Sequence, residues 1–378
     1  MVKRALLVTT VSGFVPQFEM NSVELLKEKG YEIHYASNFN YVFYGNDNSR
    51  LDGTGIIKHQ VDFSRSPYSA KTFTAYKQLC NLMKNIHFDV VHCHTPMGSF
   101  LARWAAKKTN VKTIIYTAHG FHFFKGAPLI NWMVYYSAER LMAHFTDALI
   151  TINKEDFNNA NKFKLKKGGK VYYLPGIGID TEHYSSVKVD KESLRNSLGI
   201  DEKDFVLLSV GELNTNKNHE VVIKALNRIN HNGIKYLICG KGENEAHLKH
   251  FIKELELTDT VKVLGFRSDI SEICAISDVF VFPSFREGLS VALMEAMSSG
   301  LPALASKIRG NVDLIENGKN GFLIDPSDTN SWSKYILKMK NDMSKCKKMG
   351  QVNKNKMKLY GKQVVKERLN SIYDSLKL

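Results

Sequence analysis

The stretch from Phe280 to Ser306, FVFPSFREGLSVALMEAMSSGLPALAS, holds the densest set of residues that could do chemistry. Its apolar start predicts a buried strand ending at Pro283, and the residues from Glu287 onward predict a helix that runs to about Ser299. A helix that starts after a parallel strand exposes free N–H groups and the positive end of its dipole, which favours phosphate binding. Gly288 would let the backbone approach that phosphate closely.

Two carboxylates lie in this stretch, Glu287 and, eight residues later, Glu295. If the segment were helical throughout, they would be about 12 Å apart along the axis. Glycosidase carboxylate pairs are about 5–9.5 Å apart, so this spacing better suits an extended ligand with one Glu at each end and a diphosphate between. Two ordinary surface glutamates are the alternative that the spacing leaves open.

Elements must position these residues, and the chain supplies them as short apolar runs that alternate with helical patterns. Runs that are apolar on both faces are typical of parallel strands covered by helices, so we predict an α/β protein with two Rossmann-like domains facing across a cleft. We expect domains at 1–182 and 183–360, with a terminal helix at 361–378. The predicted strands are Ala5–Thr9, Glu32–Ala36, Val90–Cys93, Thr113–Thr117, Ala148–Ile152, Val171–Leu174, Val206–Val210, Tyr236–Cys239, Val261–Leu264, Val279–Phe282, Ala303–Ala305 and Gly321–Ile324.

The net charge of the 378 residues is +14, and it is unevenly distributed. Residues 1–190 carry +8, residues 191–333 carry −4 and residues 334–378 carry +10. A slightly acidic second domain argues against nucleic acid as a partner. The basic excess of the other two parts instead suggests contact with an anionic membrane.

Five scattered cysteines without a CxxC pair argue against a disulfide framework and a structural zinc site, so we expect a reducing, cytoplasmic location.

Several segments together resemble the retaining glycosyltransferases of the GT-B fold, family 4, which build capsules and exopolysaccharides. The resemblance rests on EGLSVALMEAMSSGLP and on seven further segments in the family's order: DVVHCHTP, YTAHGFHFF, LPGIGID, LLSVGELNTNKNHEVVIKAL, YLICGKGENEAHL, VKVLGFRSDI and GNVDLIENGKNGFLI. It spans nearly the whole chain. It implies the GT-B architecture, with a first domain that binds the acceptor, a second that binds a nucleotide sugar, and a last helix that returns to the first domain. That return would join the tail's charge of +10 to the +8 of the first domain.

The resemblance also implies roles for residues of the second domain. Glu295 would bind the ribose hydroxyls, Glu287 the hydroxyls of the transferred sugar, and Lys217 the diphosphate. Backbone amides would hold the phosphates and a residue pair would flank the base; these residues are Gly288, Leu289 and Ser290 for the phosphates, and Phe266 and Arg267 for the base.

One departure from the family's pattern concerns charge. Five residues before Lys217 the family often has an arginine, and this chain has Glu212. A carboxylate cannot bind a diphosphate directly, so the missing cation must come from elsewhere. Arg286 and Arg309 are the candidates, with simple surface roles as the alternative.

The first domain offers histidines and one glycine. His119 follows a predicted strand, and the resemblance implies that it contacts the acceptor or the reacting sugar; a structural histidine is the alternative. Gly13, in the first strand–helix turn, would make room for the donor's phosphates or the acceptor. His92 and His94 share one face of a strand and could mimic metal ligands. The sequence shows no third ligand and no carboxylate near them, so we predict a polar pair of the core or the cleft and no metal site.

These inferences predict a hexosyltransferase-type enzyme that needs no metal or cofactor. It would move a sugar from a nucleoside-diphosphate sugar, expected to be a UDP-sugar, to a lipid-linked saccharide. The basic tail and Phe121, Phe123 and Phe124 would contact the inner face of an anionic plasma membrane. A nucleotide-sugar epimerase of the same architecture and a non-catalytic sugar-nucleotide-binding subunit are the alternatives.

Overall fold

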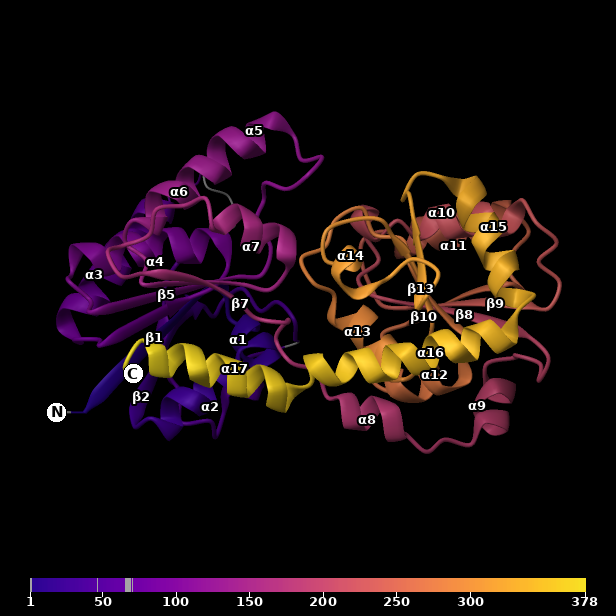
Figure 1. The fold of residues 1–378 in the computed structure, drawn as a ribbon, viewed down its shortest axis with the longest axis horizontal. Coiled ribbons are helices and arrows are strands. Elements are labelled where there is room, and N and C mark those ends of the chain that lie inside the picture. The colour runs from indigo at the N-terminus through magenta and orange to yellow at the C-terminus, as the bar shows by residue number, and fades with distance from the viewer. Residues whose placement is uncertain (1, 46, 65–68, 70) are drawn as a thin grey trace. The chain divides into compact units, whose positions relative to one another are not determined.

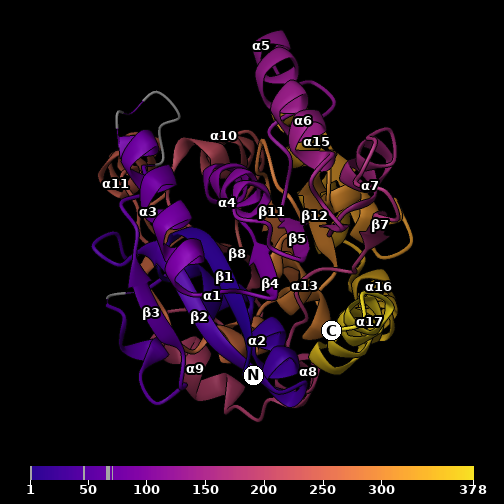
Figure 2. The same ribbon diagram turned by 90° about the vertical axis from the view of Figure 1, so that its left-hand side faces the viewer.

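The computed structural model describes residues 2–45, 47–64, 69 and 71–378, and its ribbon is shown in Figures 1 and 2. The chain divides into two compact units, one made of Met1–Gly178 and Lys362–Leu378 and the other of Ile179–Gly361. Each unit contains one sheet in which all strand pairs are parallel, with helices packed against it. The prediction of an α/β fold with two Rossmann-like sheets is confirmed.

The strands follow the buried apolar runs of the sequence. In the first unit their order across the sheet is β3-β2-β1-β4-β5-β6-β7, with bounds β1 Lys3–Val11, β2 Tyr31–Asn38, β3 Ile57–Gln60, β4 Val90–Cys93, β5 Thr113–Ala118, β6 Ala148–Thr151 and β7 Lys170–Tyr173. In the second unit the order is β10-β9-β8-β11-β12-β13, with bounds β8 Phe205–Val210, β9 Ile234–Cys239, β10 Val261–Gly265, β11 Val279–Phe282, β12 Ala303–Ser306 and β13 Gly321–Ile324.

Helices connect the strands and cover the sheets. Those of the first unit are α1 Phe14–Phe18, α2 Met20–Glu28, η1 Ser49–Leu51, α3 Lys71–Asn85, α4 Pro96–Lys108, α5 Leu129–Asn131, η2 Trp132–Tyr136, α6 Ser137–Ala143, α7 Lys154–Ala160 and α17 Lys362–Ser375. Those of the second unit are α8 Thr181–Ser186, α9 Lys191–Ser197, η3 Thr215–Lys217, α10 His219–Asn227, α11 Glu245–Glu254, α12 Ile270–Ile276, α13 Val291–Ser298, α14 Asn311–Leu314, α15 Thr329–Lys340, α16 Met343–Met357 and η4 Lys358–Tyr360.

The interior strand β1 shows why the sheet needs helices on both faces. Leu6 and Val8 belong to one buried cluster, whereas Ala5 and Leu7 belong to another. Successive side chains of a strand point to opposite faces, so an unbroken apolar run supplies both cores at once.

Short polar side chains mark where several helices begin. The side chains of Asn153, Asp180, Asp190, Ser290 and Asp328 each accept a hydrogen bond from a backbone N–H two or three residues into the helix that follows. Each such cap satisfies one of the N–H groups that a helix start leaves unpaired.

Among the described residues, β3 is the one strand that the sequence patterns did not predict. It lies at the sheet edge, and its Ile57 is 41% exposed. Because an edge strand is covered on fewer sides, its sequence, IKHQ, lacks the apolar run that revealed the other strands.

The last helix, α17, completes the core of the first unit, as predicted. Its buried residues Val365, Leu369 and Ile372 pack in the same cluster as Leu7 of β1. The hydroxyl of Tyr373, also on α17, lies 2.9 Å from Nδ1 of His92 on β4. Figure 1 shows this helix beside α2.

The expectation that the basic tail would join its whole charge to the first domain is wrong. Of the tail, residues 334–378, only those from 362 onward belong to the first unit. Nine of the thirteen basic residues after position 333 therefore lie in the second unit. On α17, Lys366 is neutralised by Glu24 and Glu28 of α2, each at 2.9 Å. The proposed phenylalanine contact also fails for Phe121 and Phe123, which are 3% and 0% exposed.

Candidate functional site

The second unit brings Lys217 and Glu287 together at the carboxyl ends of two neighbouring strands. Lys217 follows β8 and Glu287 follows β11, and these strands pair in the centre of the sheet. Nζ of Lys217 lies 2.7 Å from Oε1 of Glu287, and both side chains are mostly buried. Nζ also lies 4.8 Å from the ring centroid of Phe282, which holds the cation over an apolar surface.

Asparagines fix the loops that carry this pair. Asn214 caps η3 by accepting from the N–H of Lys217, and Asn216 donates to the carbonyl of Arg286 at 3.0 Å. Asn218, which adopts a left-handed conformation with φ of 52°, donates to the carbonyl of Pro283 at 3.1 Å. Asn tolerates this conformation better than most residues, and its bond ties the start of α10 to the end of β11.

Close packing between Gly310 and Gly288 orders the backbone around Glu287. A Cβ atom on Gly310 would lie 2.1 Å from the carbonyl oxygen of Gly288, and Gly310 has a φ of +79°, so only glycine fits there. This approach brings the neighbouring Arg309, which is 7% exposed, to donate from Nε to the carbonyl of Glu287 at 3.0 Å. Arg309 therefore holds its guanidinium against the backbone of Glu287.

The helix that follows Glu287 starts later than the sequence predicted. Ser290 is the N-cap of α13 and accepts from the N–H of Leu293, so Glu287 lies before the helix and the 12 Å estimate does not apply. The predicted end near Ser299 is confirmed: α13 ends at Ser298, and Gly300 follows with φ of +88°. The amides around Gly288, Leu289 and Ser290 thus precede a true helix N-terminus.

Glu295 lies on α13 and interacts with Tyr184 of α8. Burial, followed by the charge of Glu295, raises the pKa of the Tyr184 hydroxyl, which hydrogen-bonds that carboxylate. By donating a hydrogen bond, a tyrosine helps to hold a carboxylate in one orientation. A carboxylate needs a fixed orientation if it is to accept hydrogen bonds from two vicinal hydroxyls. Tyr184 was not among the predicted site residues, and no sequence pattern singles it out.

Phe266 and Arg267 follow β10. Phe266 is 72% exposed, so its ring is available for stacking. The guanidinium of Arg267 makes two bonds to the carboxylate of Asp269, with Nε 2.8 Å from Oδ1. Asp269 thereby holds the arginine in a fixed plane.

Glu212 stands where the family's pattern often has an arginine. Glu212 is exposed and accepts from Asn214 at 3.0 Å. Of the two candidate replacements, Arg286 is exposed, whereas Arg309 is buried and fixed beside Glu287. The geometry therefore favours Arg309 as the second cation.

His219, two residues after Lys217, provides a pH-dependent test of this region. It is 4% exposed, and its burial, aided by the charge of Lys217, lowers its pKa to about 3. In the unfolded chain the pKa of this histidine would be about 6.5, so between that pH and about 3 the unfolded state binds more protons than the folded state. The free energy of unfolding therefore decreases as the pH falls through this range. We expect His219 to account for about 2 kcal/mol of lost stability between pH 7 and pH 5.

Urea unfolding of the parent and of His219→Gln at both pH values measures this effect. The variant should lose less stability on acidification than the parent. His250→Gln, at a position where the side chain is 71% exposed, is the matched control and should retain the parent's pH dependence. Equal pH dependence in the parent and His219→Gln would contradict the assignment.

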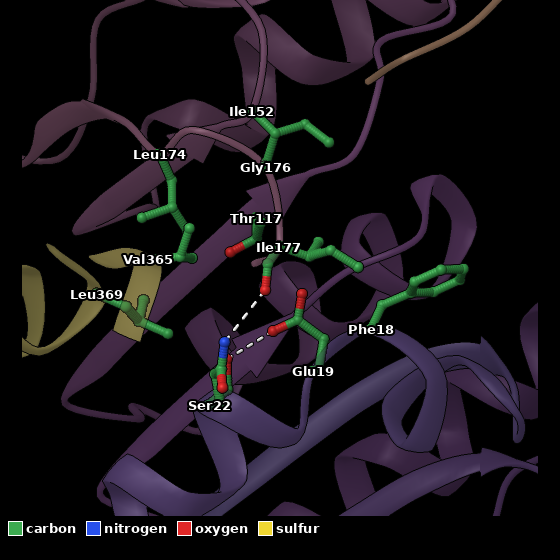
Figure 3. A pocket seen from close by; sticks show the side chains of 11 residues that line it. Phe18, Glu19, Ser22, Thr117, Ile152, Leu174, Gly176, Ile177, Val365 and Leu369 are labelled. Carbon is green, nitrogen blue, oxygen red and sulfur yellow. Dashed lines mark hydrogen bonds between the residues drawn. The ribbon is translucent and has the colours of Figure 1, made fainter. Parts of the chain in front are cut away.

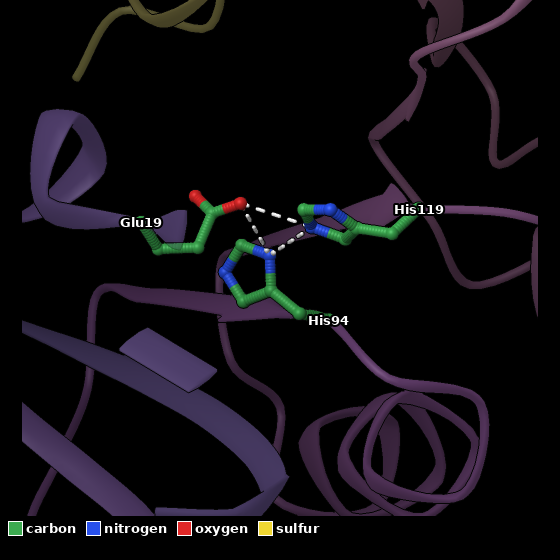
Figure 4. A group of neighbouring side chains, drawn as sticks. All are labelled: Glu19, His94 and His119. Carbon is green, nitrogen blue, oxygen red and sulfur yellow. Dashed lines mark hydrogen bonds and ion pairs between the residues drawn. The ribbon is translucent and has the colours of Figure 1, made fainter. Parts of the chain in front are cut away.

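The first unit gathers a second polar cluster, formed by Glu19, His94 and His119 (Figure 4). Oε1 of Glu19 lies 3.0 Å from Nε2 of His119 and 3.3 Å from Nδ1 of His94. The three residues come from the short link between α1 and α2 and from the ends of β4 and β5. Predicted as a site residue, His119 is 19% exposed in its side chain, whereas Glu19 and His94 are buried.

The electrostatics of the cluster keep Glu19 ionised. Burial alone would raise the pKa of Glu19, but the charge of His94 and hydrogen bonds from both histidines hold it well below its usual value. Burial lowers the pKa of His119, and its bond to Glu19 opposes that shift. Because Nε2 of His119 faces a carboxylate, Nδ1 is the ring atom that can accept a hydrogen bond from a ligand hydroxyl.

The other oxygen of Glu19 is also held in place. Oγ of Ser22 donates to Oε2 at 2.6 Å, beside a small pocket of about 10 Å³ (Figure 3). Nearby, Nδ2 of Asn21 donates to the carbonyl of Ile177 at 3.1 Å, which ties α2 to the segment after β7. With both oxygens engaged, Glu19 orients His119 and has little freedom to move.

The interpretation of His92 and His94 is only half right. His92 bonds Tyr373 and Thr117 and is a core residue, as expected, with a pKa lowered by burial. The statement that no carboxylate lies near His94 is wrong, because Glu19 contacts it. Glu19 is far from His94 in sequence, so no spacing pattern could reveal it.

Gly13 packs against the chain itself. A Cβ atom at this position would lie 1.7 Å from the carbonyl oxygen of Phe43, so a side chain has no room. This contact explains the glycine by packing, and its role toward a ligand stays a prediction.

Comparison with known proteins identifies the class. A family model described as glycosyl transferases group 1 matches residues 190–356, and one described as glycosyl transferase 4-like matches residues 3–153. The chain is 33% identical to the putative glycosyltransferase EpsD of Bacillus subtilis, over 99% of this chain and 97% of the relative. The chain belongs to the group 1 glycosyltransferase family.

Two further comparisons agree with this assignment. The chain is 33% identical to the UDP-Gal:alpha-D-GlcNAc-diphosphoundecaprenol alpha-1,3-galactosyltransferase of Escherichia coli, over 70% of this chain and 69% of that protein. The crystal structure of HepE from Anabaena in complex with UDP superposes with a TM-score of 0.78 at 19% identity, over 99% of this chain and 100% of that one. The fold is therefore GT-B, and the protein is a glycosyltransferase.

Proposed function

We propose that the protein transfers a sugar from a nucleoside-diphosphate sugar, with a UDP-sugar as donor, to a lipid-linked saccharide during exopolysaccharide assembly. The main support for a nucleoside-diphosphate sugar as donor is the Lys217–Glu287 pair, held at 2.7 Å before the N-terminus of α13. A cation and a helix N-terminus suit a diphosphate, and a fixed carboxylate suits sugar hydroxyls. The names of the relatives support a lipid-linked saccharide as acceptor, since the Escherichia coli protein acts on a diphosphoundecaprenol-linked sugar.

Each remaining residue has a proposed role. Glu295, oriented by Tyr184, binds the ribose hydroxyls; Phe266 and Arg267 flank the base. Arg309 supplements Lys217 as the diphosphate leaves. His119, oriented by Glu19, contacts a hydroxyl of the reacting sugar or the acceptor. We also propose retention of the anomeric configuration, for which the family resemblance is the support.

A donor panel tests this function. Purified protein is incubated with UDP-, GDP- and ADP-sugars and an undecaprenyl-diphosphate-linked saccharide, and nucleotide release and the sugar product are both measured. Release of UDP with a lengthened lipid-linked product supports the proposal. A changed nucleotide sugar without transfer would instead indicate an epimerase, and turnover of only GDP- or ADP-sugars would contradict the choice of UDP.

We expect transfer to be independent of metal. Lys217, Arg309 and the amides before α13 offset the charge of the leaving diphosphate, which is the task a divalent ion would otherwise perform. Treatment with EDTA should therefore change the rate by less than about twofold. Loss of activity that Mg²⁺ or Mn²⁺ restores would contradict this, and Glu19, His94 and His119, whose ligand-type atoms lie within 4.8 Å of one another, would be the first positions to examine.

A further inference from the structure

An apolar helical face in the first unit is left without a partner. The segments α5, η2 and α6 form one continuous helical arm over residues 129–143, and Figures 1 and 2 both show α5 projecting from the rest of the unit. Large apolar side chains on one side of this arm are exposed: Leu129 by 80%, Ile130 by 55%, Met133 by 63%, Val134 by 40% and Leu141 by 55%.

The spacing shows that these residues share one face. Positions 129, 130, 133, 134 and 141 follow the helical period, so the exposed apolar side chains line up along the arm. The other side is occupied: Trp132, Tyr135 and Tyr136 pack against the core cluster, and Met142 and Ala143 are buried. An exposed apolar row of this length on an otherwise packed unit marks an interaction surface.

The exposed charged side chains within the segment of the arm are positive, although Glu155 lies at the backbone N–H of Lys125. Lys125 precedes it and Arg140 lies on it, and both are exposed. Between residues 125 and 146 the sequence has one acidic residue, Glu139, which is buried and paired with Arg103 at 2.7 Å. The whole first unit carries 26 basic and 14 acidic residues, a net charge of +12.

A basic pocket of about 290 Å³ lies at the base of the arm. Its lining includes His144, which continues the exposed face of α6, and Phe145, together with Lys107, Lys112 and Lys166. Within the described ranges, Lys166 pairs with Asp147 at 2.8 Å, whereas Lys107 and Lys112 have no carboxylate partner. Uncompensated lysines in a recess next to an apolar helix complement the phosphates of a lipid surface.

We propose that residues 129–143 form a membrane-docking arm that lies in the interface of an anionic bilayer. Its apolar face enters the acyl boundary, while Lys125, Arg140 and the lysines of the pocket contact lipid phosphates. In the part of the chain that the structure describes, no helix is both long and apolar enough to cross a membrane, which agrees with an arm that lies on the surface. The biological purpose of docking rests on the proposed lipid-linked acceptor, whereas the exposure and the charge of the surface do not depend on it.

Vesicle co-sedimentation tests the docking arm. The full chain is mixed with vesicles of phosphatidylcholine alone or with about one-third phosphatidylglycerol, at low and high salt. We expect binding to the anionic vesicles at low salt, weaker binding at high salt and little binding to neutral vesicles. The double variant Leu129→Glu/Met133→Glu should bind at least about tenfold more weakly, because it places two carboxylates on the inserted face.

Matched variants separate the two parts of the surface. Lys107→Ala and Lys112→Ala should each weaken binding by about fivefold, through lost attraction to anionic lipid. Leu359→Glu, at a residue of the second unit that is 56% exposed, is the control and should bind as the parent does. Parent-like binding by Leu129→Glu/Met133→Glu, or no binding of the parent to anionic vesicles, would overturn the proposal.

Two further readouts separate membrane docking from dimer formation and from catalysis. If size-exclusion chromatography shows a dimer that Leu129→Glu/Met133→Glu dissociates while vesicle binding is unchanged, a second copy covers the face and the proposal is wrong. Slow hydrolysis of the donor, measured without lipid, should be equal in parent and arm variants. An inactive parent that still binds vesicles would refute the proposed function and leave the docking arm standing.

Discussion

The Lys217→Ala variant is expected to release nucleotide from its donor about 100- to 1000-fold more slowly than the parent. Nζ of Lys217 lies 2.7 Å from the carboxylate of Glu287, and it is held there by η3 and by the ring of Phe282. Its loss would remove the charge that offsets the leaving diphosphate. It would also leave the Glu287 carboxylate unpaired, so that this group would repel the phosphates.

Steady-state assays with a UDP-sugar measure this effect, and the loss should fall mainly on kcat because the leaving-group charge develops in the transition state. Lys241→Ala, in an exposed loop of the same unit, is the matched control and should retain activity within about threefold. Circular dichroism would show that both variants are folded. If Lys217→Ala kept the parent's kcat, Lys217 would not serve the leaving group.

The Glu139→Gln variant should lose about 3–5 kcal/mol of stability. Glu139 on α6 binds the fully buried Arg103, with Oε2 2.7 Å from Nη2, and accepts from the hydroxyl of Tyr116 at 3.2 Å. The guanidinium also lies 4.1 Å from the Tyr116 ring centroid. Removing the carboxylate would leave a buried cation without its counter-charge, which costs far more than losing a surface ion pair.

Urea unfolding compares this variant with two others. Arg103→Met/Glu139→Leu removes both charges and should be more stable than Glu139→Gln, because no buried ion is left unpaired. Glu245→Ala, which breaks the exposed pair with Lys249, should cost no more than about 1 kcal/mol. A loss below about 1 kcal/mol in Glu139→Gln would show that the buried guanidinium finds another partner or water.

Much of the fold could be predicted because its strands are buried on both faces. The runs Val90–Cys93 and Val279–Phe282 were predicted to the residue, and β3 was missed because its edge position requires no apolar run. The extent of α13 shows a different limit. Helix propensity allows a start at Glu287, which is a better helix former than Val291, whereas the hydroxyl of Ser290 decides where the first turn begins.

The site was predictable where its residues follow strands and unpredictable where tertiary contacts make it. Lys217 and Glu287 were each identified, but their ion pair joins residues 70 positions apart and depends on β8 lying next to β11. Glu19 and Tyr184 carry no motif, and each acquires its role from the partner it meets. The docking arm was missed because an apolar helical period looks the same whether its face is covered by protein or exposed.

The route of the chain through α17 has a consequence for synthesis on the ribosome. The first unit receives Val365, Leu369, Ile372 and Tyr373 from a helix that is translated after the entire second unit. Until that helix emerges, Leu7 and His92 lack part of their packing, and the nascent first unit exposes apolar surface. The second unit is contiguous, so it can finish folding earlier. We therefore expect the order of completed folding to run opposite to the order of translation, which makes the unfinished first unit a substrate for chaperones.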